Sequence, residues 1–228
     1  MALFTISDLH LSLSSDKPMD IFRGWEGYVE KLRTNWLSNI TNEDTVVIPG
    51  DISWEMRINK TYTDFNFINQ LPGRKILMKG NHDLWWDSVS KMNRFFNEND
   101  FKFEILHNNC LFYKDYALAG SRGWFFDDKS DDAVKVLNRE AARGERSLQQ
   151  AAQSGKEIIL FLHYPPVTTD NSCDEIMNVI KKYNVKRCYY GHIHKAGSFK
   201  AVNGTVDGIA FRCVSCDILG FVPLKIAD

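Results

Sequence analysis

Histidines beside carboxylates and amides recur along this chain in a pattern that suits metal binding. Five of the six histidines stand at the ends of apolar runs, next to a glycine, a carboxylate, an amide or a second histidine. Imidazole and carboxylate are the ligands that borderline divalent metals prefer. The blocks are Asp8-Leu9-His10, Gly50-Asp51, Gly80-Asn81-His82-Asp83, His163 and Gly191-His192-Ile193-His194. Their seven candidate ligands are too many for one ion and suit two, which predicts a dinuclear centre of the kind that hydrolases use.

The blocks differ in how specifically each one, taken alone, indicates metal binding. Asp8 and His10 are two residues apart, so an extended backbone would point both side chains to one side. His192-Ile193-His194 repeats this spacing with two imidazoles, and Gly191 allows a tight exit from a strand. Gly80-Asn81-His82-Asp83 is more specific, because it supplies an amide oxygen, an imidazole and a carboxylate on one turn.

Each residue also has an ordinary interpretation. Asp8 alone would more often be a cap, and His163, before Pro165-Pro166, a buried core histidine. Asp51 and Asn81 both follow a glycine and could be turn residues. These interpretations would have to hold at five strand ends at once, so the joint pattern favours ligands. His107 has no such context and is predicted to lie in a surface turn.

Short apolar segments precede the blocks and predict buried strands. Nearly continuous apolar strands are typical of parallel or mixed sheets covered by helices, and ligands gather beyond their carboxyl ends. The predicted strands are 3–7, 45–48, 75–78, 116–119, 158–162 and 186–190. Helical patterns cover 25–40, 61–69, 88–97, 132–153 and 173–183. This alternation predicts an α/β fold in which five loops converge on one place.

The C-terminal third changes character. Residues 199–202, 205–214 and 217–222 read as successive strands, with turns at Asn203-Gly204 and near Cys216. They suggest a second sheet, so we expect a four-layer α/β/β/α sandwich of two mixed sheets flanked by helices. No linker divides the chain, which predicts a single domain over 1–228, with an insertion at 124–153 that could cover the site as a cap.

Charge and cysteine content limit the binding partners and the cellular compartment that we expect for this chain. The formal net charge of −1 gives no reason to expect nucleic-acid or anionic-membrane binding, although it does not exclude a local basic groove. The five cysteines are irregularly spaced, and Cys213 and Cys216 lack the second half of a zinc ribbon. We expect reduced thiols, no targeting segment, no membrane span and a cytoplasmic location.

Taken together and in this order, the blocks resemble the calcineurin-like metallophosphoesterase superfamily, in particular prokaryotic phosphohydrolases of unassigned substrate. The matching blocks span positions 8 to 194. The resemblance implies a phosphate-ester hydrolase in which a hydroxide bridging two metal ions attacks phosphorus in line. One metal would be held by Asp8, His10, Asp51 and His194, and the second by Asn81, His163, His192 and the bridging Asp51. Mixed nitrogen and oxygen ligands favour Mn, Fe, Zn or Co.

The same resemblance assigns His82 to the substrate. Protonated His82 would stabilise the phosphoryl group or protonate the leaving oxygen, with Asp83 as its expected partner. The chain departs from protein Ser/Thr phosphatases, because Trp54 stands three residues after Asp51 where they carry an aspartate, and their following Arg-Gly is missing. A phosphoprotein substrate is therefore disfavoured.

Three further residues are candidates for substrate binding. The guanidinium of Arg122 suits bidentate phosphate contact, and Trp54 and Trp85 could wall the pocket; a solvated loop arginine and core packing are the alternatives. Among small phosphate esters, the sequence favours a diester (cyclic nucleotide, nucleic acid or lipid-derived) over a monoester. A non-catalytic scaffold on the same fold would be expected to have lost ligands. The natural substrate and the oligomeric state stay open.

Overall fold

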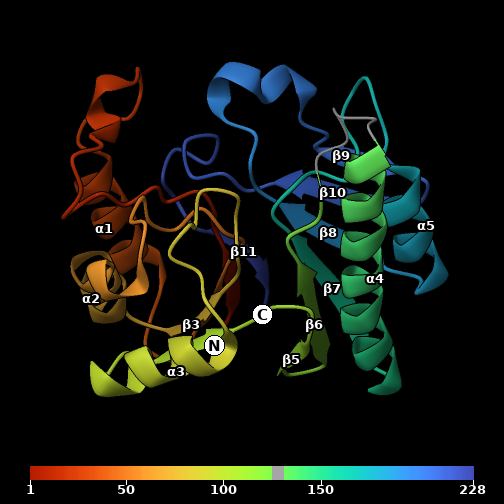
Figure 1. Ribbon diagram of the computed structural model, residues 1–228, viewed down its shortest axis with the longest axis horizontal. Helices are drawn as coiled ribbons and strands as arrows, with labels where there is room; N and C mark the ends of the chain where they lie inside the picture. Colours follow the sequence, from red (N-terminus) through yellow and green to blue (C-terminus); the bar gives the residue numbers. More distant parts are fainter. Residues whose placement is uncertain (125–130) are drawn as a thin grey trace.

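Short apolar strands form two β-sheets that lie face to face (Figure 1). A computed structural model describes residues 1–124 and 131–228 of the chain. The first sheet has the order β11-β1-β2-β3-β4, with β1 (Leu3–Thr5), β2 (Thr45–Ile48), β3 (Arg74–Leu77), β4 (Phe103–Ile105) and β11 (Leu224–Ala227). The second has the order β5-β6-β7-β8-β10-β9, with β5 (Cys110–Tyr113), β6 (Tyr116–Ser121), β7 (Glu157–Leu162), β8 (Arg187–Tyr190), β9 (Gly204–Val206) and β10 (Ile209–Cys213).

Both sheets are mixed. In the first, β1 to β4 are parallel and β11 is antiparallel to β1. In the second, β6, β7, β8 and β10 are parallel, whereas β5 and β9 run antiparallel to their neighbours. The parallel strands of each sheet therefore present their carboxyl ends at one edge.

Alternate residues of the central strands face different layers, which explains why the strands are apolar throughout. In β2, Val46 and Ile48 join an apolar cluster with helices, whereas Val47 joins a cluster that also contains Ile159 of β7. In β7, Leu160 faces away from that shared cluster, toward the helices of the other side. Strands buried on both faces need apolar side chains at every position.

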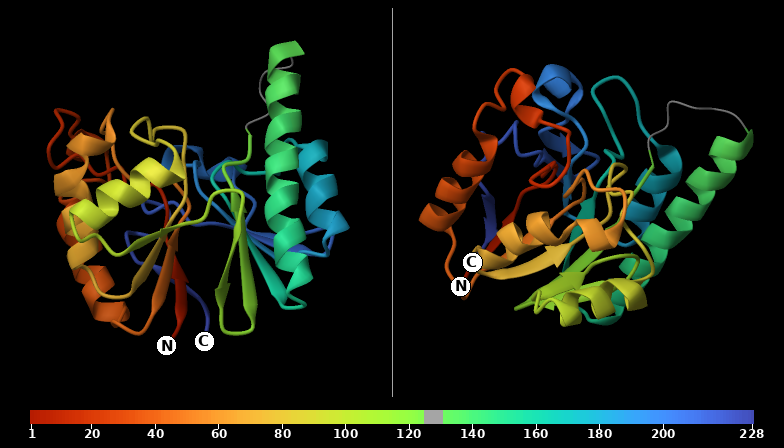
Figure 2. Two further views of the ribbon diagram at one scale, coloured as in Figure 1. Left: turned by 60° about the horizontal axis from the view of Figure 1, so that its bottom comes forward. Right: turned by 60° about the vertical axis from the view of Figure 1, so that its left-hand side comes forward.

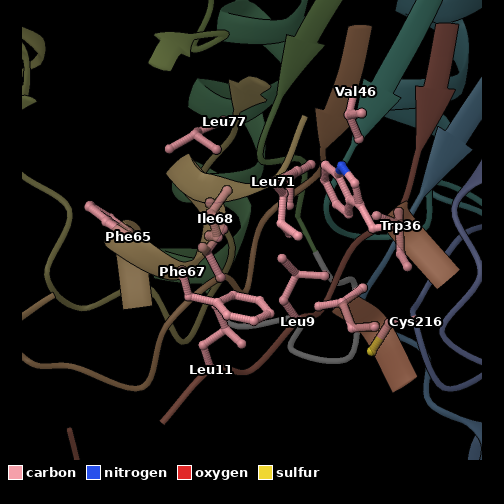
Figure 3. Packing of buried hydrophobic residues seen from close by; sticks show 14 of the residues in the cluster. Leu9, Leu11, Trp36, Val46, Phe65, Phe67, Ile68, Leu71, Leu77 and Cys216 are labelled. Atoms are coloured by element: carbon pink, nitrogen blue, oxygen red, sulfur yellow. The ribbon is translucent and has the colours of Figure 1, made fainter. Parts of the chain in front are cut away.

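Helices cover the outer face of each sheet. They are α1 (Tyr28–Asn39), α2 (Tyr62–Gln70) and α3 (Val89–Glu98) on the first sheet, and α4 (Asp131–Gln153) and α5 (Asp174–Lys182) on the second. Figure 3 shows Trp36 of α1 and Phe65 of α2 among the buried side chains of the first outer layer. The predicted four-layer α/β/β/α sandwich is confirmed, and all five predicted helices are present within a few residues.

The predicted C-terminal strands were partly wrong. Residues 199 and 200 belong to a 3-10 helix, η3 (Lys195–Lys200), residue 201 forms an isolated bridge, and 217–221 form turns. The hairpin turn lies at Asp207-Gly208, both with positive φ (52° and 77°), which splits the predicted strand 205–214 into β9 and β10. Asp-Gly favours this tight turn. The last strand, β11, pairs with β1 in the first sheet. The sequence patterns also missed β4 and β5.

Other expectations meet the structure only in part. All five cysteines are free, and Cys213 and Cys216 are buried. None of the helices in residues 1–124 and 131–228 has both the length and the apolar character needed to cross a membrane. The predicted cap over 124–153 falls partly on 125–130, which lie outside the described residues. Its remainder is largely α4, which packs on β6 and α5, and a role over the site stays a prediction.

Candidate active site

The loops that follow β1, β2, β3, β7 and β8 carry the five blocks, and they meet at one end of the sandwich. An isolated parallel bridge between Ser7 and Ser215 joins the segment after β1 to the segment after β10, so the carboxyl edges of the two sheets come together. Figure 2 shows these loops at the end opposite the chain termini. The topology thus gathers side chains that are up to 186 positions apart, from Asp8 to His194.

The spacing of Asp8 and His10 predicted an extended backbone at the site, and this prediction was wrong. Asp8, His10, Asp51 and His192 all have positive φ, at 58°, 44°, 51° and 69°. Non-glycine residues rarely adopt this conformation, and it persists only where surrounding structure enforces it. Fully buried Leu9 and Leu11 flank His10 within the first core (Figure 3), so apolar packing fixes the direction of its side chain.

Asp8, His10 and His194 form the first donor group. Their ligating atoms lie within 4.8 Å of one another. The Nε2 atoms of His10 and His194 are 3.2 Å apart, and His10 Nε2 is 3.7 Å from Asp51 Oδ2. Three nitrogen and oxygen donors thus face a common point, with a second carboxylate beside them.

The second donor group is centred on Asn81. Its Oδ1 lies 2.7 Å from His163 Nε2 and 2.9 Å from His192 Nδ1. Asp51 Oδ1 is 3.6 Å from His163 Nε2, and Asp8, Asp51 and His163 also lie within 4.8 Å of one another. The two oxygens of Asp51 therefore point one toward each group.

The protonation states of these groups fit divalent cations. Burial lowers the pKa of His163 and of His192 to about 4, and burial and neighbouring histidines hold the pKa of His10 well below its usual value. These imidazoles are neutral near pH 7 and have a lone pair to offer. Burial, Asp8 and Asp83 raise the pKa of Asp51. The pKa of His194 is raised, despite its burial, by its contact with Asp217 and by Asp8. Metal ions would supply positive charge to the crowded carboxylates beside the three neutral imidazoles.

Two supporting contacts escaped the sequence patterns. Asp217 Oδ1 lies 3.2 Å from His194 Nδ1, and its Oδ2 accepts a 2.8 Å hydrogen bond from the Lys195 backbone N–H. Ser7 and Ser215 both donate to Asp8 Oδ2. Such outer contacts orient ligands. Asp217 comes after the end of β10, just as each of the five blocks comes after the end of a strand. The sequence pattern placed Asp217 inside a predicted strand at 217–222, so it was not recognised as a candidate.

Asp83 does not partner His82 as expected. It is fully buried, and its Oδ2 accepts hydrogen bonds of 2.8 Å from the backbone N–H groups of Asp51 and Gly80. Its Oδ1 accepts from the Ile52 N–H at 2.8 Å and from the Trp85 indole at 2.9 Å. The carboxylate ties the loop after β2 to the loop after β3. It positions ligands and has no contact with the His82 ring among the described residues.

Trp85 and Arg122 also differ from the expectation. Trp85 is 2% exposed and packs edge-on against Phe65, so it belongs to the core, and it does not line the cavity described next. Arg122 lies 3.8 Å from buried Glu140 and above the Trp124 ring, and it does not line the cavity described next. Its contact with substrate stays a prediction. His107 is partly buried beside Trp86, 5.4 Å between ring centres, and is not an exposed turn residue.

A cavity of about 400 Å³ opens beside the first donor group. His82 and Trp54 both line it, with their rings 4.4 Å apart. The His82 backbone N–H donates to Asp51 Oδ1 at 2.8 Å, which places its ring next to the donor atoms but outside both groups. The full lining is His10, Met19, Phe22, Arg23, Trp25, Trp54, His82, His194, Lys195, Ala196 and Asp217.

Close approach of the loops requires glycine at position 80. A Cβ there would lie 2.1 Å from Asp51 Oδ1 and 2.3 Å from the Asp51 backbone nitrogen. We expect Gly80→Ala to lower the free energy of unfolding by about 1–3 kcal/mol and to reduce metal content. Gly204→Ala, with nothing within 4 Å of the added carbon, is the matched control. Urea denaturation and elemental analysis measure both effects; metal content equal to that of the control would contradict the expectation.

Comparison with known proteins identifies the family. The sequence model described as calcineurin-like phosphoesterase matches residues 1–196. The chain belongs to this family. Calcineurin-like phosphoesterases use divalent metal ions and act on phosphate esters, so the chain is a metal-dependent phosphoester hydrolase. The resemblance predicted from the blocks is confirmed.

Related proteins agree with this membership. A curated relative from Fibrobacter succinogenes is named "Probable cyclic nucleotide phosphodiesterase" and is 25% identical to this chain. The alignment covers 88% of this chain and 75% of the relative. The crystal structure of TT1561 of Thermus thermophilus matches 99% of the chain and 97% of its own, with a TM-score of 0.60 and 11% identity. A protein of unknown function from Aquifex aeolicus matches 98% of this chain and 95% of its own, with a TM-score of 0.55 and 18% identity. The two structures share the fold of this chain.

Proposed function

We propose that the chain is a dinuclear phosphodiesterase. The observation that carries the proposal is the position of Asp51, whose two oxygens point to two separate donor groups. One ion would bind Asp8, His10, Asp51 and His194. The other would bind Asn81, His163, His192 and Asp51.

The donor set supports two ions over one. Two nearby cations repel each other, and a shared carboxylate reduces this repulsion. Asn81 is a neutral ligand, so it limits the negative charge placed in a buried site. The mixed imidazole, carboxylate and amide set favours Mn, Fe, Zn or Co over Mg or Ca. When bound, such ions lower the pKa of a water molecule and neutralise phosphate oxygens.

His82 is the group proposed to act on the substrate itself. Its ring lines the cavity beside the donor groups but belongs to neither. Burial lowers the pKa of His82, and the negative charge of Asp8 opposes that effect. An anionic phosphate ester in contact with the ring would raise this lowered pKa, because an opposite charge favours the imidazolium. Protonated His82 can then bind the phosphate or give its proton to the leaving oxygen.

The cavity favours a diester over a monoester. A phosphodiester carries a second organic group on phosphorus, and the space of about 400 Å³ beside His10 and His194 offers a place for it. The name of the Fibrobacter succinogenes relative points the same way. A monoester would need anion-binding groups around three free oxygens, and Arg122, the expected one, contacts Glu140.

Metal analysis combined with paired substrates tests the proposal. We expect about two ions per chain after loading with Mn²⁺, and kcat/KM for bis(p-nitrophenyl) phosphate at least about tenfold above that for p-nitrophenyl phosphate. A reversed ratio would identify a phosphomonoesterase. Two bound ions without turnover of either ester would indicate a non-catalytic scaffold.

A further inference from the structure

The cavity beside the first donor group has an aromatic and apolar side that metal binding does not explain. Some of the lining residues are candidate ligands or lie next to them. A second set comes from the segment before α1, and this segment includes η1 (Met19–Ile21). This second set consists of Met19, Phe22, Arg23 and Trp25. Lys195 and Ala196, at the start of η3, also line the cavity. None of these residues belongs to the five sequence blocks.

Trp25 fixes the inner wall of the cavity. It is 5% exposed and packs edge-on against Tyr28 and Phe221, with ring centres 5.2 and 5.3 Å away. Its ring is also 5.9 Å from that of His10 and 5.8 Å from that of His194. A group attached to a phosphate held by the first donor group would therefore meet a rigid indole within one ring's distance.

Phe22 lies at the outer side of the same space. It lines the cavity and is still 52% exposed. An aromatic side chain that is half exposed at the edge of an apolar cavity gains buried area when a ligand ring enters. Trp54 completes the aromatic lining on the side of His82. Planar rings pack well between such walls.

Cations accompany these rings. Arg23 and Lys195 line the cavity, and Lys17 Nζ lies 5.0 Å from the centre of the Trp54 ring. Positive groups beside aromatic walls suit a ligand with polar or anionic atoms as well as a flat apolar face. A bare hydrocarbon chain would leave these cations without partners. The volume of about 400 Å³ suits one compact ring system with its sugar better than a long chain.

We propose that this cavity is a subsite for a nucleoside, with the base held between Trp25 and Phe22 while the attached phosphate reaches the donor groups. The proposal rests on the proposed phosphodiesterase function, and it names the substrate class as nucleoside phosphate esters. Phe22 is the specificity-determining residue, because it is the exposed ring that a bound base would cover.

A binding experiment on the Mn²⁺-loaded protein tests the subsite without relying on diester turnover. Adenosine 5′-monophosphate and ribose 5-phosphate carry the same sugar and phosphate and differ in the base. Isothermal titration calorimetry should give at least about tenfold tighter binding of the nucleotide, as expected for stacking of one base. Phe22→Ala should remove most of this difference and leave the affinity for ribose 5-phosphate unchanged.

Ile21→Ala is the matched control, since Ile21 is 73% exposed, precedes Phe22 and does not line the cavity. It should keep the full preference for the nucleotide. Equal affinities of the wild-type protein for the two ligands would overturn the subsite, as would tighter binding of octyl phosphate than of the nucleotide. Failure of the diesterase proposal would appear separately, as a reversed ratio of diester to monoester hydrolysis.

Discussion

Replacing His82 by alanine should lower kcat by about two to four orders of magnitude while both metal ions remain bound. The ring lines the cavity next to His10 and His194, yet it lies outside the two donor groups. The hydrogen bond from His82 to Asp51 comes from the backbone N–H, which alanine preserves. The variant therefore removes the imidazole and keeps the geometry of the ligands.

The His82→Ala measurement needs a histidine control. His107 is partly buried, has a pKa lowered by burial to about 4, and lies away from the cavity beside Trp86. His107→Ala should leave kcat within about threefold of the wild-type value, because substitutions outside the chemistry have small effects on the transition state.

Metal content decides between the roles of His82. Elemental analysis of His82→Ala should match the wild-type protein, and the basic limb of the pH–rate profile should change, because a group that acts in its protonated form loses its proton as the pH rises. Loss of both metals along with activity would make His82 a ligand, and the division of roles would be wrong.

The convergence of the blocks could be predicted because it follows from topology. Parallel strands bring their carboxyl ends to one edge, so Asp8, Asp51 and Asn81 had to be neighbours once β1, β2 and β3 paired. The wrong step concerned the backbone: an extended Asp8-x-His10 was expected, and positive φ at both residues was found. The surrounding core, not local propensity, enforces that conformation.

The supporting contacts could not be predicted, because they depend on which loops touch. Asp83 adjoins His82 in sequence, but its carboxylate faces backbone N–H groups 30 to 32 positions away. Trp85 follows a motif loop as Trp54 does, yet only Trp54 lines the cavity. Asn203-Gly204 and Asp207-Gly208 are both turn signals, and the pairing of β9 with β10 selects the second.

Asp51→Asn is expected to reduce metal content and activity together. Asparagine keeps the shape of the side chain and an oxygen for the His82 N–H, but it removes the negative charge that the two donor groups share. We expect less than about one ion per chain at stoichiometric Mn²⁺ and a fall of at least about a thousandfold in kcat/KM, the scale of several kcal/mol lost with metal-ion catalysis.

Asp217→Asn provides a graded comparison. Asp217 contacts His194 and is not in either donor group, so its loss should weaken metal binding by about 10- to 100-fold, with activity restored by excess Mn²⁺. Excess metal should restore Asp51→Asn much less, since a shared ligand is missing and not merely misoriented.

Without metal, the Asp51→Asn protein should be at least as stable as the wild-type protein, whereas with metal the wild-type protein should be the more stable. Burial, Asp8 and Asp83 raise the pKa of Asp51, so its ionised form destabilises the metal-free fold at pH values above the raised pKa. The neutral amide of Asp51→Asn removes this cost, and its urea midpoint at pH 7 without metal should equal or exceed that of the wild-type protein. With Mn²⁺ present the wild-type protein should become the more stable of the two, because only its site binds both ions tightly. An Asp51→Asn protein that is less stable without metal would show that the carboxylate supports the fold itself, and retention of two ions would show that it is not shared.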